Sequence, residues 1–275
     1  MTAVPASTSP ARGGEALHEF AFAGAPQRRL STVFRPAQGV PRAALLLCPP
    51  FFHEHFLSYR LLSLVAARLA ERGIASLRFD YFGSGDSWGE ESAFTLAGAV
   101  ADAEVALAEL ARRAPALPCS VLGARAGGWI AARLARCHRL PLWLWQPLPR
   151  GQVWLDELIA MDRRERASRQ RYPFLGAQPW PSDPERLLAA YCPPALRAEL
   201  AAQDLEALLE SAVEPVHVVD DERAAPLARA TTWHALPAAA AAWHERIDLR
   251  ATFITPPVAA CIEALARLAP GAEAA

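Results

Sequence analysis

The chain has 275 residues, of which 52% are hydrophobic, and its formal net charge is -1. It is long and apolar enough to bury a full core, which excludes a disordered or fibrous protein. All 28 basic residues are arginine, and they are balanced by acidic residues, so no basic field attracts nucleic acid or an anionic membrane.

The cysteine pattern and the N-terminus indicate a cytoplasmic protein. The five cysteines are odd in number and lie mostly inside apolar runs, which is typical of reduced core residues rather than of disulfides or a zinc site. Residues 1–14 are rich in small residues and proline, and they predict a flexible N-terminus without a signal peptide. No segment approaches the roughly 20 apolar residues of a membrane helix. We expect no membrane span, no cofactor and no metal.

Strands and helices alternate along the first half of the chain. The turn at Gly24 predicts an antiparallel hairpin of strands over 16–23 and 29–34. Further strands are expected over 43–48, 74–79, 119–122 and 140–145, and helices over 59–72, 94–113 and 129–140. This alternation predicts a mostly parallel sheet flanked by helices on both faces.

The alternation is interrupted once. Residues 151–211 show a charged helical pattern with several prolines, and strand patterns resume over 213–219 and 247–253. We therefore expect a core formed by 15–150 and 212–275, with 151–211 inserted as a helical cap.

The most informative motif is Gly123-Ala124-Arg125-Ala126-Gly127. It has the spacing of the nucleophile elbow G-x-S-x-G, in which the nucleophile stands on a strained turn between a strand and a helix. Here arginine replaces the serine, and a guanidinium has no lone pair with which to attack a carbonyl. The sequence thus predicts an elbow that has lost its nucleophile.

The chain resembles the α/β-hydrolase superfamily, and more narrowly the predicted hydrolases of type 2 that are encoded with exosortase A systems. The resemblance covers most of the chain from about residue 43. It is carried by Pro49-Pro50-Phe51 with Glu54, Ser58 and Arg60; by Arg78-Phe79-Asp80-Tyr81 with Gly83, Gly85, Asp86 and Ser87; by Leu144-Trp145-Gln146-Pro147 with Gly151; and by Trp243.

This resemblance implies an α/β-hydrolase fold with an inserted helical cap, an elbow arginine that is a family trait, and a link to exopolysaccharide and protein-sorting loci. The chain departs from the family pattern at His53, at His55 and at Phe253-Ile254.

A serine hydrolase of this fold needs serine, an acid and histidine in that chain order. Asp220, directly after the strand over 213–219, stands where the acid is expected. No histidine follows the strand over 247–253, and His234 and His244, which precede it, are expected to be surface or helix-face residues. The serine and the histidine of the triad are therefore expected to be absent. Other candidate nucleophiles are interpreted as turn or core residues: Ser84, Ser87 and Cys119.

The oxyanion hole, which stabilises developing negative charge, is expected to be present in this chain. Its backbone N–H donors would be those of Ala126 and of Phe51 or Phe52. Arg125 adds a forked cationic donor, which favours a site for an acyl, carboxylate or phosphate-bearing ligand. Gln146, at the end of a strand, is expected to line the same pocket.

An unpaired guanidinium in an apolar pocket would cost several kcal/mol, so Arg125 is expected to pair with Glu54 or Asp220. His53 and His55 flank Glu54 and would share a face on an extended chain. Because no third ligand can be identified from the spacing, we expect no metal there. Either histidine could instead act as a general base for a water molecule.

Three functions remain open. The first is a diverged hydrolase-fold protein without serine-hydrolase activity that binds a small acyl or anionic ligand. The second is an active hydrolase of ester or thioester bonds that uses His53 or His55 and water. The third is a non-catalytic scaffold that binds a protein partner in a polysaccharide or sorting pathway.

Overall fold

The computed structural model describes residues 18–168, 173–174, 179–212, 214–244 and 254–269. An eight-stranded sheet forms its centre, in the order β1-β2-β4-β3-β5-β6-β9-β10. β2 runs antiparallel to both of its neighbours, and every other neighbouring pair is parallel. The strands are β1 (Glu19–Ala23), β2 (Leu30–Arg35), β3 (Ala43–Cys48), β4 (Ile74–Phe79), β5 (Cys119–Ala124), β6 (Leu142–Trp145), β9 (Val216–Asp221) and β10 (Thr232–Leu236).

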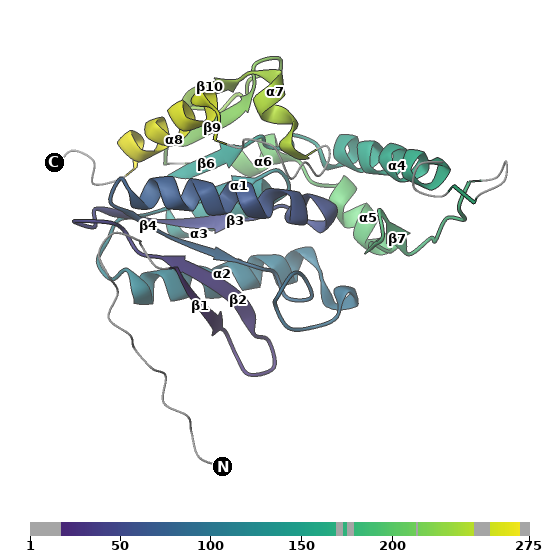
Figure 1. The fold of residues 1–275 in the computed structure, drawn as a ribbon, viewed down its shortest axis with the longest axis horizontal. Coiled ribbons are helices and arrows are strands. Elements are labelled where there is room, and N and C mark those ends of the chain that lie inside the picture. The colour runs from purple at the N-terminus through teal and green to yellow at the C-terminus, as the bar shows by residue number, and fades with distance from the viewer. Residues whose placement is uncertain (1–17, 169–172, 175–178, 213, 245–253, 270–275) are drawn as a thin grey trace, which may run out of the picture.

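Helices cover both faces of the sheet (Figure 1). α1 and α8 pack against one face, and α2 and α3 pack against the other. The helices are α1 (Phe52–Ala70), α2 (Leu96–Arg113), α3 (Gly127–His138), α4 (Gly151–Ala167), α5 (Pro194–Ala201), α6 (Leu205–Leu209), α7 (Ala238–Ala241) and α8 (Pro256–Leu268), with the short 3-10 helices η1 (Glu91–Ala93) and η2 (Ala242–His244). None of the helices in the described part of the chain combines the length and hydrophobicity of a membrane span.

The strand β3 shows why the central strands are continuously apolar. Successive side chains of a strand point to opposite faces of the sheet. Leu46 lies in the core beneath α2 and α3, whereas Leu45 and Leu47 lie in the core beneath α1 and α8. All six residues of β3 are buried, because helices cover both sides of the strand.

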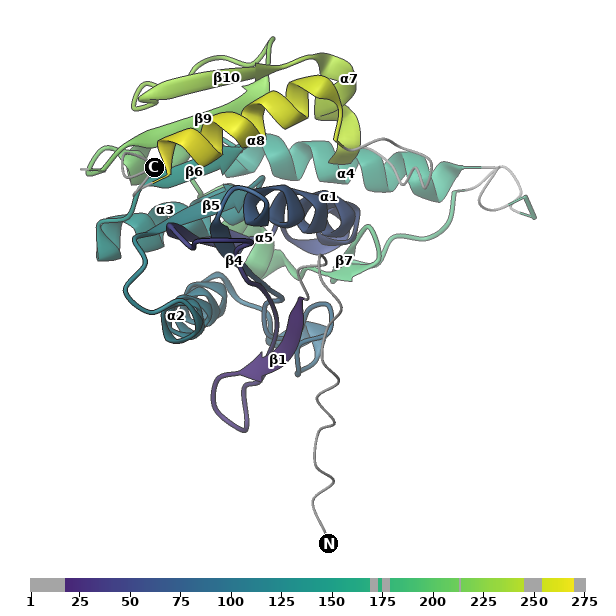
Figure 2. The same cartoon turned by 60° about the vertical axis from the view of Figure 1, so that its left-hand side comes forward.

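In its described residues, the segment between β6 and β9 holds three helices and a small hairpin. β7 (Arg186–Leu187) pairs with β8 (Ala190–Tyr191) between α4 and α5, and this hairpin was not expected from the helical pattern. In Figure 1, α4, α5 and β7 lie together at one side of the molecule, beyond the central sheet, and Figure 2 again shows α4 extending past the sheet. The division into a core and a cap at residues 151 and 211 stays a prediction.

One expected boundary differs from the structure, and one strand was not predicted, each for a physical reason. α1 begins at Phe52, seven residues before the expected start at Tyr59. Its first turns bury Glu54, His55 and Ser58, so polar side chains carry the helical period there and the hydrophobic pattern misses it. β10 was also missed, because most of its side chains are only partly buried. The expected strand over 247–253 and the expected flexible residues 1–14 lie outside the described residues.

The turn after β5 is packed too closely for a side chain at Gly123. A Cβ atom there would lie 2.5 Å from the Cα of Gly128 and 2.6 Å from the carbonyl oxygen of Gly127. We expect Gly123→Ala to lower the free energy of unfolding by about 1–3 kcal/mol, measured by urea denaturation.

Gly128→Ala is the matched control. The nearest atom to its added Cβ is the side-chain Cδ2 of Leu144, at 3.2 Å, which can shift. Alanine also favours the helix, so this variant should be close to neutral. Equal losses in the two variants would contradict the close packing at Gly123.

Candidate functional site

The candidate site lies where the connections of the sheet diverge. β3 and β5 are neighbours, and Cys48 at the end of β3 pairs with Gly123 of β5. β3 leads into α1 on one face, and β5 leads into α3 on the other. Ligand sites of α/β sheets lie at such a divergence, at the carboxyl ends of the strands.

Arg125 stands on the sharp turn between β5 and α3. Its φ angle is +49°, in the left-handed region that costs a non-glycine residue about 1–2 kcal/mol. Two backbone hydrogen bonds hold it: its N–H donates to the carbonyl of Trp145 at 3.0 Å, and its carbonyl accepts from the N–H of Gly128 at 2.9 Å. The strand, strained turn and helix of the predicted elbow are therefore present, with Arg125 at the nucleophile position.

Glu54 is the ionic partner of Arg125, as one of the two expected pairings requires. The Nε and Nη2 atoms of Arg125 both donate to Glu54 Oε1, at 3.2 and 3.0 Å. The indole Nε1 of Trp154, on α4, donates to the same oxygen at 3.0 Å. Glu54 is only 2% exposed and Arg125 9%. Glu54 lies in the first turn of α1, where the helix dipole also stabilises a carboxylate.

Polar atoms without a protein partner lie next to this ion pair. Glu54 Oε2 and both ring nitrogens of His53 are buried without a hydrogen-bond partner in the described structure. Burial lowers the pKa of His53. The charge of Glu54 raises this pKa, and the charge of Arg125 lowers it further. The imidazole is therefore neutral near pH 7. Unsatisfied buried groups of this kind are costly, which makes them available to a ligand or water.

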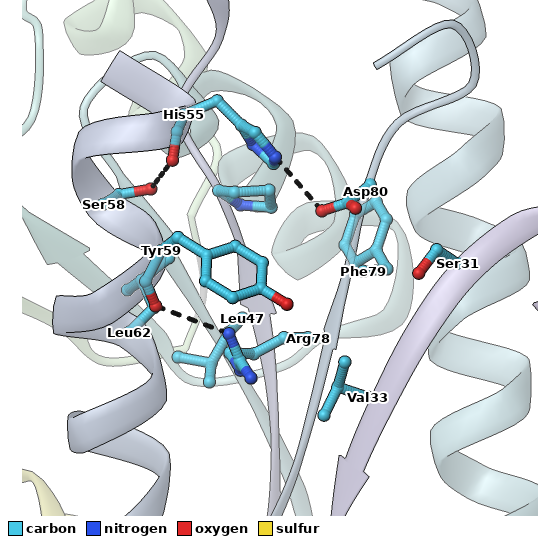
Figure 3. Close-up of a pocket in the computed structure, with 11 residues that line it drawn as sticks. Ser31, Val33, Leu47, His55, Ser58, Tyr59, Leu62, Arg78, Phe79 and Asp80 are labelled. Atoms are coloured by element: carbon cyan, nitrogen blue, oxygen red, sulfur yellow. Dashed lines mark hydrogen bonds and ion pairs between the residues drawn. The ribbon is translucent and has the colours of Figure 1, made fainter. Parts of the chain in front are cut away.

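His55 faces a different part of the molecule. Residues two apart on a helix point roughly 200° apart, so the shared face expected for His53 and His55 on an extended chain is wrong. His55 Nε2 lies 3.1 Å from Asp80 Oδ1 (Figure 3). The space beside this pair is about 20 Å³, enough for one water molecule. Among the described residues, no group of three or more His, Cys, Asp or Glu side chains could hold a metal.

Asp220 lies near the end of β9, where the acid of a triad is expected. Burial raises its pKa to about 6, although the backbone N–H of Asp221 and the charge of Arg125 both lower it. The N–H of Asp221 donates to Asp220 Oδ1 at 2.8 Å.

His244 bears on the expected absence of a triad histidine, which stays a prediction. It ends η2, which follows β10, the last strand in the described part of the chain. Burial and then the charge of Arg125 lower its pKa to about 4, against a weaker opposing effect of Glu54. His244 Nδ1 lies 3.1 Å from the carbonyl of Ala241. By contrast His234, on β10, stacks on Trp143 with ring centroids 5.7 Å apart.

Gln146 holds the segment that carries His244. Its Nε2 donates to the carbonyl of Ala241 at 2.8 Å, and its Oε1 accepts a hydrogen bond from the indole of Trp243. Gln146 is itself strained, with a φ angle of +46°. Its amide is thus used to position the chain around α7 and η2, and a direct contact of Gln146 with a ligand stays a prediction.

A cavity of about 430 Å³ opens between the start of α1, the connection from β4 to α2, and the β7–β8 hairpin. Aromatic rings form much of its wall: Phe51, Phe52, Phe56, Tyr81, Phe94 and Tyr191. His53 also lines the cavity, whereas Arg125, Glu54, Ala126 and Gln146 do not. Phe52 stacks on Trp154 with centroids 6.2 Å apart, and Trp154 in turn bonds Glu54. The cavity and the ion pair are therefore neighbours.

Comparisons with known proteins agree with this architecture. Residues 39–142 match the family described as serine aminopeptidase, S33. An α-β serine hydrolase homologue from Coxiella burnetii is 14% identical and has a TM-score of 0.53, covering 90% of this chain and 96% of that one. A hypothetical protein from Pseudomonas aeruginosa is 12% identical with a TM-score of 0.57, covering 90% and 93%. No curated protein matches the chain.

Est1E from Butyrivibrio proteoclasticus, solved with ferulic acid bound, is 16% identical with a TM-score of 0.52, covering 79% of this chain and 88% of that one. The chain has the α/β-hydrolase fold, as its motifs predict: a mostly parallel central sheet flanked by helices.

The ion pair can be tested by a double-mutant cycle. Arg125→Met leaves the Glu54 carboxylate buried without its counter-ion, so we expect a loss of about 3–5 kcal/mol in the free energy of unfolding. Combining it with Glu54→Leu should cost less than the sum of the two single changes, with a coupling of about 1–3 kcal/mol. Arg72→Met, which removes the exposed pair with Glu263, is the control and should cost at most about 1 kcal/mol.

Asp220 predicts a pH dependence. The carboxyl group has an ordinary pKa of 3.8, and burial raises it to about 6 in the folded protein. Its favourable contribution is therefore present below pH 4 and is lost as the pH rises through 6. Asp220→Asn cannot ionise, so its stability relative to the natural chain should rise by about 2–3 kcal/mol between pH 4 and pH 7, since one pKa unit corresponds to about 1.4 kcal/mol. A constant difference across this range would show that Asp220 is not desolvated.

Proposed function

We propose that this chain is a diverged α/β-hydrolase-fold protein that lacks serine-hydrolase activity and binds a small acyl ligand beneath residues 151–211, which act as its cap. The observation that supports this most is the buried contact of Arg125 with Glu54 at the nucleophile position. Trp154 of α4 joins the same contact, so the altered elbow is built into the packing of the cap.

Two of the candidate nucleophiles, Ser87 and Cys119, are held in structural roles. Ser87 Oγ donates to the carbonyl of Asp80 at 2.6 Å and accepts from the N–H of Ser31, so it serves the loop after β4. Burial raises the pKa of the Cys119 thiol to about 11, which keeps it protonated and unreactive at neutral pH. Moving Arg125 aside would leave Glu54 unpaired in an apolar site, at a cost of several kcal/mol.

The aromatic cavity supports an acyl ligand. Its volume of about 430 Å³ lies in the range of small-molecule sites, and phenylalanine and tyrosine rings form part of its wall. An anionic ligand held by Arg125 is less well supported, because two guanidinium donors already bond Glu54 and that carboxylate neutralises the charge. The proposed link to an exopolysaccharide pathway in the cytoplasm rests on the resemblance of the motifs to the exosortase A-associated group.

One observation favours a second candidate, an ester or thioester hydrolase that activates water. His53 is neutral and unpartnered beside Glu54, and His244 and Asp220 keep the chain order of a triad. His55 fits this role less well than expected, because Asp80 occupies its Nε2 atom.

A fluorophosphonate probe and a panel of acyl esters distinguish the two candidates. We expect no covalent labelling of the natural chain and no turnover above the uncatalysed rate, measured by intact mass and by spectrophotometry. Turnover that His53→Ala abolishes would instead support the water-activating hydrolase and overturn the proposal.

Arg125→Ser tests whether the rest of the triad is in place. Serine would then stand on the strained elbow, with Asp220 and His244 following in the required order. We expect weak but measurable ester hydrolysis, because His244 Nδ1 bonds Ala241 rather than a carboxylate. His244→Ala in the Arg125→Ser background should remove this activity, and activity that survives it would mean that His244 is not the base.

A further inference from the structure

We infer that the aromatic cavity selects ligands with an uncharged or cationic head group and discriminates against carboxylates and phosphates of the same size. This inference rests on the proposed function and takes it further by naming the chemical class of the ligand. It is carried by the charges on the cavity wall and by the aromatic faces beside them.

The apolar part of the wall is preformed. Phe51 packs edge-on against Tyr81 and Phe94, with ring centroids 5.3 and 5.1 Å away. Phe52 also packs against Phe94, at 5.8 Å. These three contacts join the start of α1 to the connection between β4 and α2, so the rings are fixed by one another rather than by a ligand. An aryl or short acyl body can therefore bind without reorganising the wall.

The charged side chains on this wall are acidic. Glu90 and Glu91 line the cavity, and no arginine does so among the described residues. Glu91 Oε2 pairs with Arg186 Nη1 at 3.1 Å, and among the described residues no ion pair is present for Glu90, which lies at the solvent-exposed rim of the cavity. His53 adds no positive charge, because burial lowers its pKa. A carboxylate or phosphate in this space would meet like charge, whereas an ammonium group would be attracted.

The positive charge of Arg125 does not reverse this balance. Arg125 does not line the cavity, and the stacked rings of Phe52 and Trp154 lie at the boundary between the two sites. Its guanidinium is also neutralised by Glu54 at 3.0 Å. Aromatic faces attract cations in addition, which further favours an ammonium head group over a carboxylate.

Three probes that share one body test the inference: 3-phenylpropanamide, 3-phenylpropylamine and 3-phenylpropanoate, titrated into the full chain by calorimetry at pH 7. We expect the amide to bind, the amine to bind about 2–5 times more tightly than the amide, and the carboxylate to bind several times more weakly. Glu90→Gln should remove the advantage of the amine and leave the affinity for the amide unchanged.

Two controls locate the effect. Glu157→Gln makes the same change in net charge at an exposed position of α4 outside the cavity wall, and it should alter none of the three affinities. Phe56→Ser removes a ring that is 71% exposed and lines the cavity, so it should weaken all three probes without unfolding the protein.

The outcomes separate the two proposals. If the carboxylate binds as tightly as the amide or more tightly, the charge selectivity is wrong while ligand binding in the cavity stands. If no probe binds, or if Phe56→Ser leaves all affinities unchanged, the proposed ligand-binding function of this cavity is wrong as well.

Discussion

One buried oxygen atom, Oε1 of Glu54, accepts hydrogen bonds from Arg125 after β5 and from Trp154 on α4, while its own side chain comes from α1. Burying such a pair is tolerable only when the geometry satisfies its donors and acceptors, because desolvation of two charges costs several kcal/mol per ion. The arginine at the elbow and the glutamate at the start of α1 therefore form one structural unit. Neither residue can be interpreted without the other.

The topology of the sheet brings these distant parts of the sequence together. β3, β5, β6 and β9 are consecutive neighbours that run parallel, so the segments after their carboxyl ends meet at one edge. Glu54, Arg125, Gln146 and Asp220 each lie at or shortly after the end of one of these strands. The segment after β10 adds His244 to the same edge. The polar side chains at this edge are thus arranged around Arg125, whose guanidinium cannot attack a carbonyl.

The sequence was most informative where burial is simple and least informative where polar residues are buried. The apolar runs of β3 and β4 predicted these strands residue for residue. The need of a buried guanidinium for a counter-ion predicted its pairing, and Glu54 provides it. The start of α1 was missed because its buried face is polar, and that error also misplaced His55, which bonds Asp80. His244 was missed because β10 has no continuous apolar pattern that would mark a last strand before it.

Trp154 connects the turn at Arg125 to α4. Its indole is 1% exposed, its ring packs against Phe52 and Trp129, and its N–H bonds the carboxylate that neutralises Arg125. The position of α4 and the Arg125–Glu54 ion pair are therefore linked through one side chain. A substitution at Arg125 is therefore expected to change both the stability of the fold and the packing of α4.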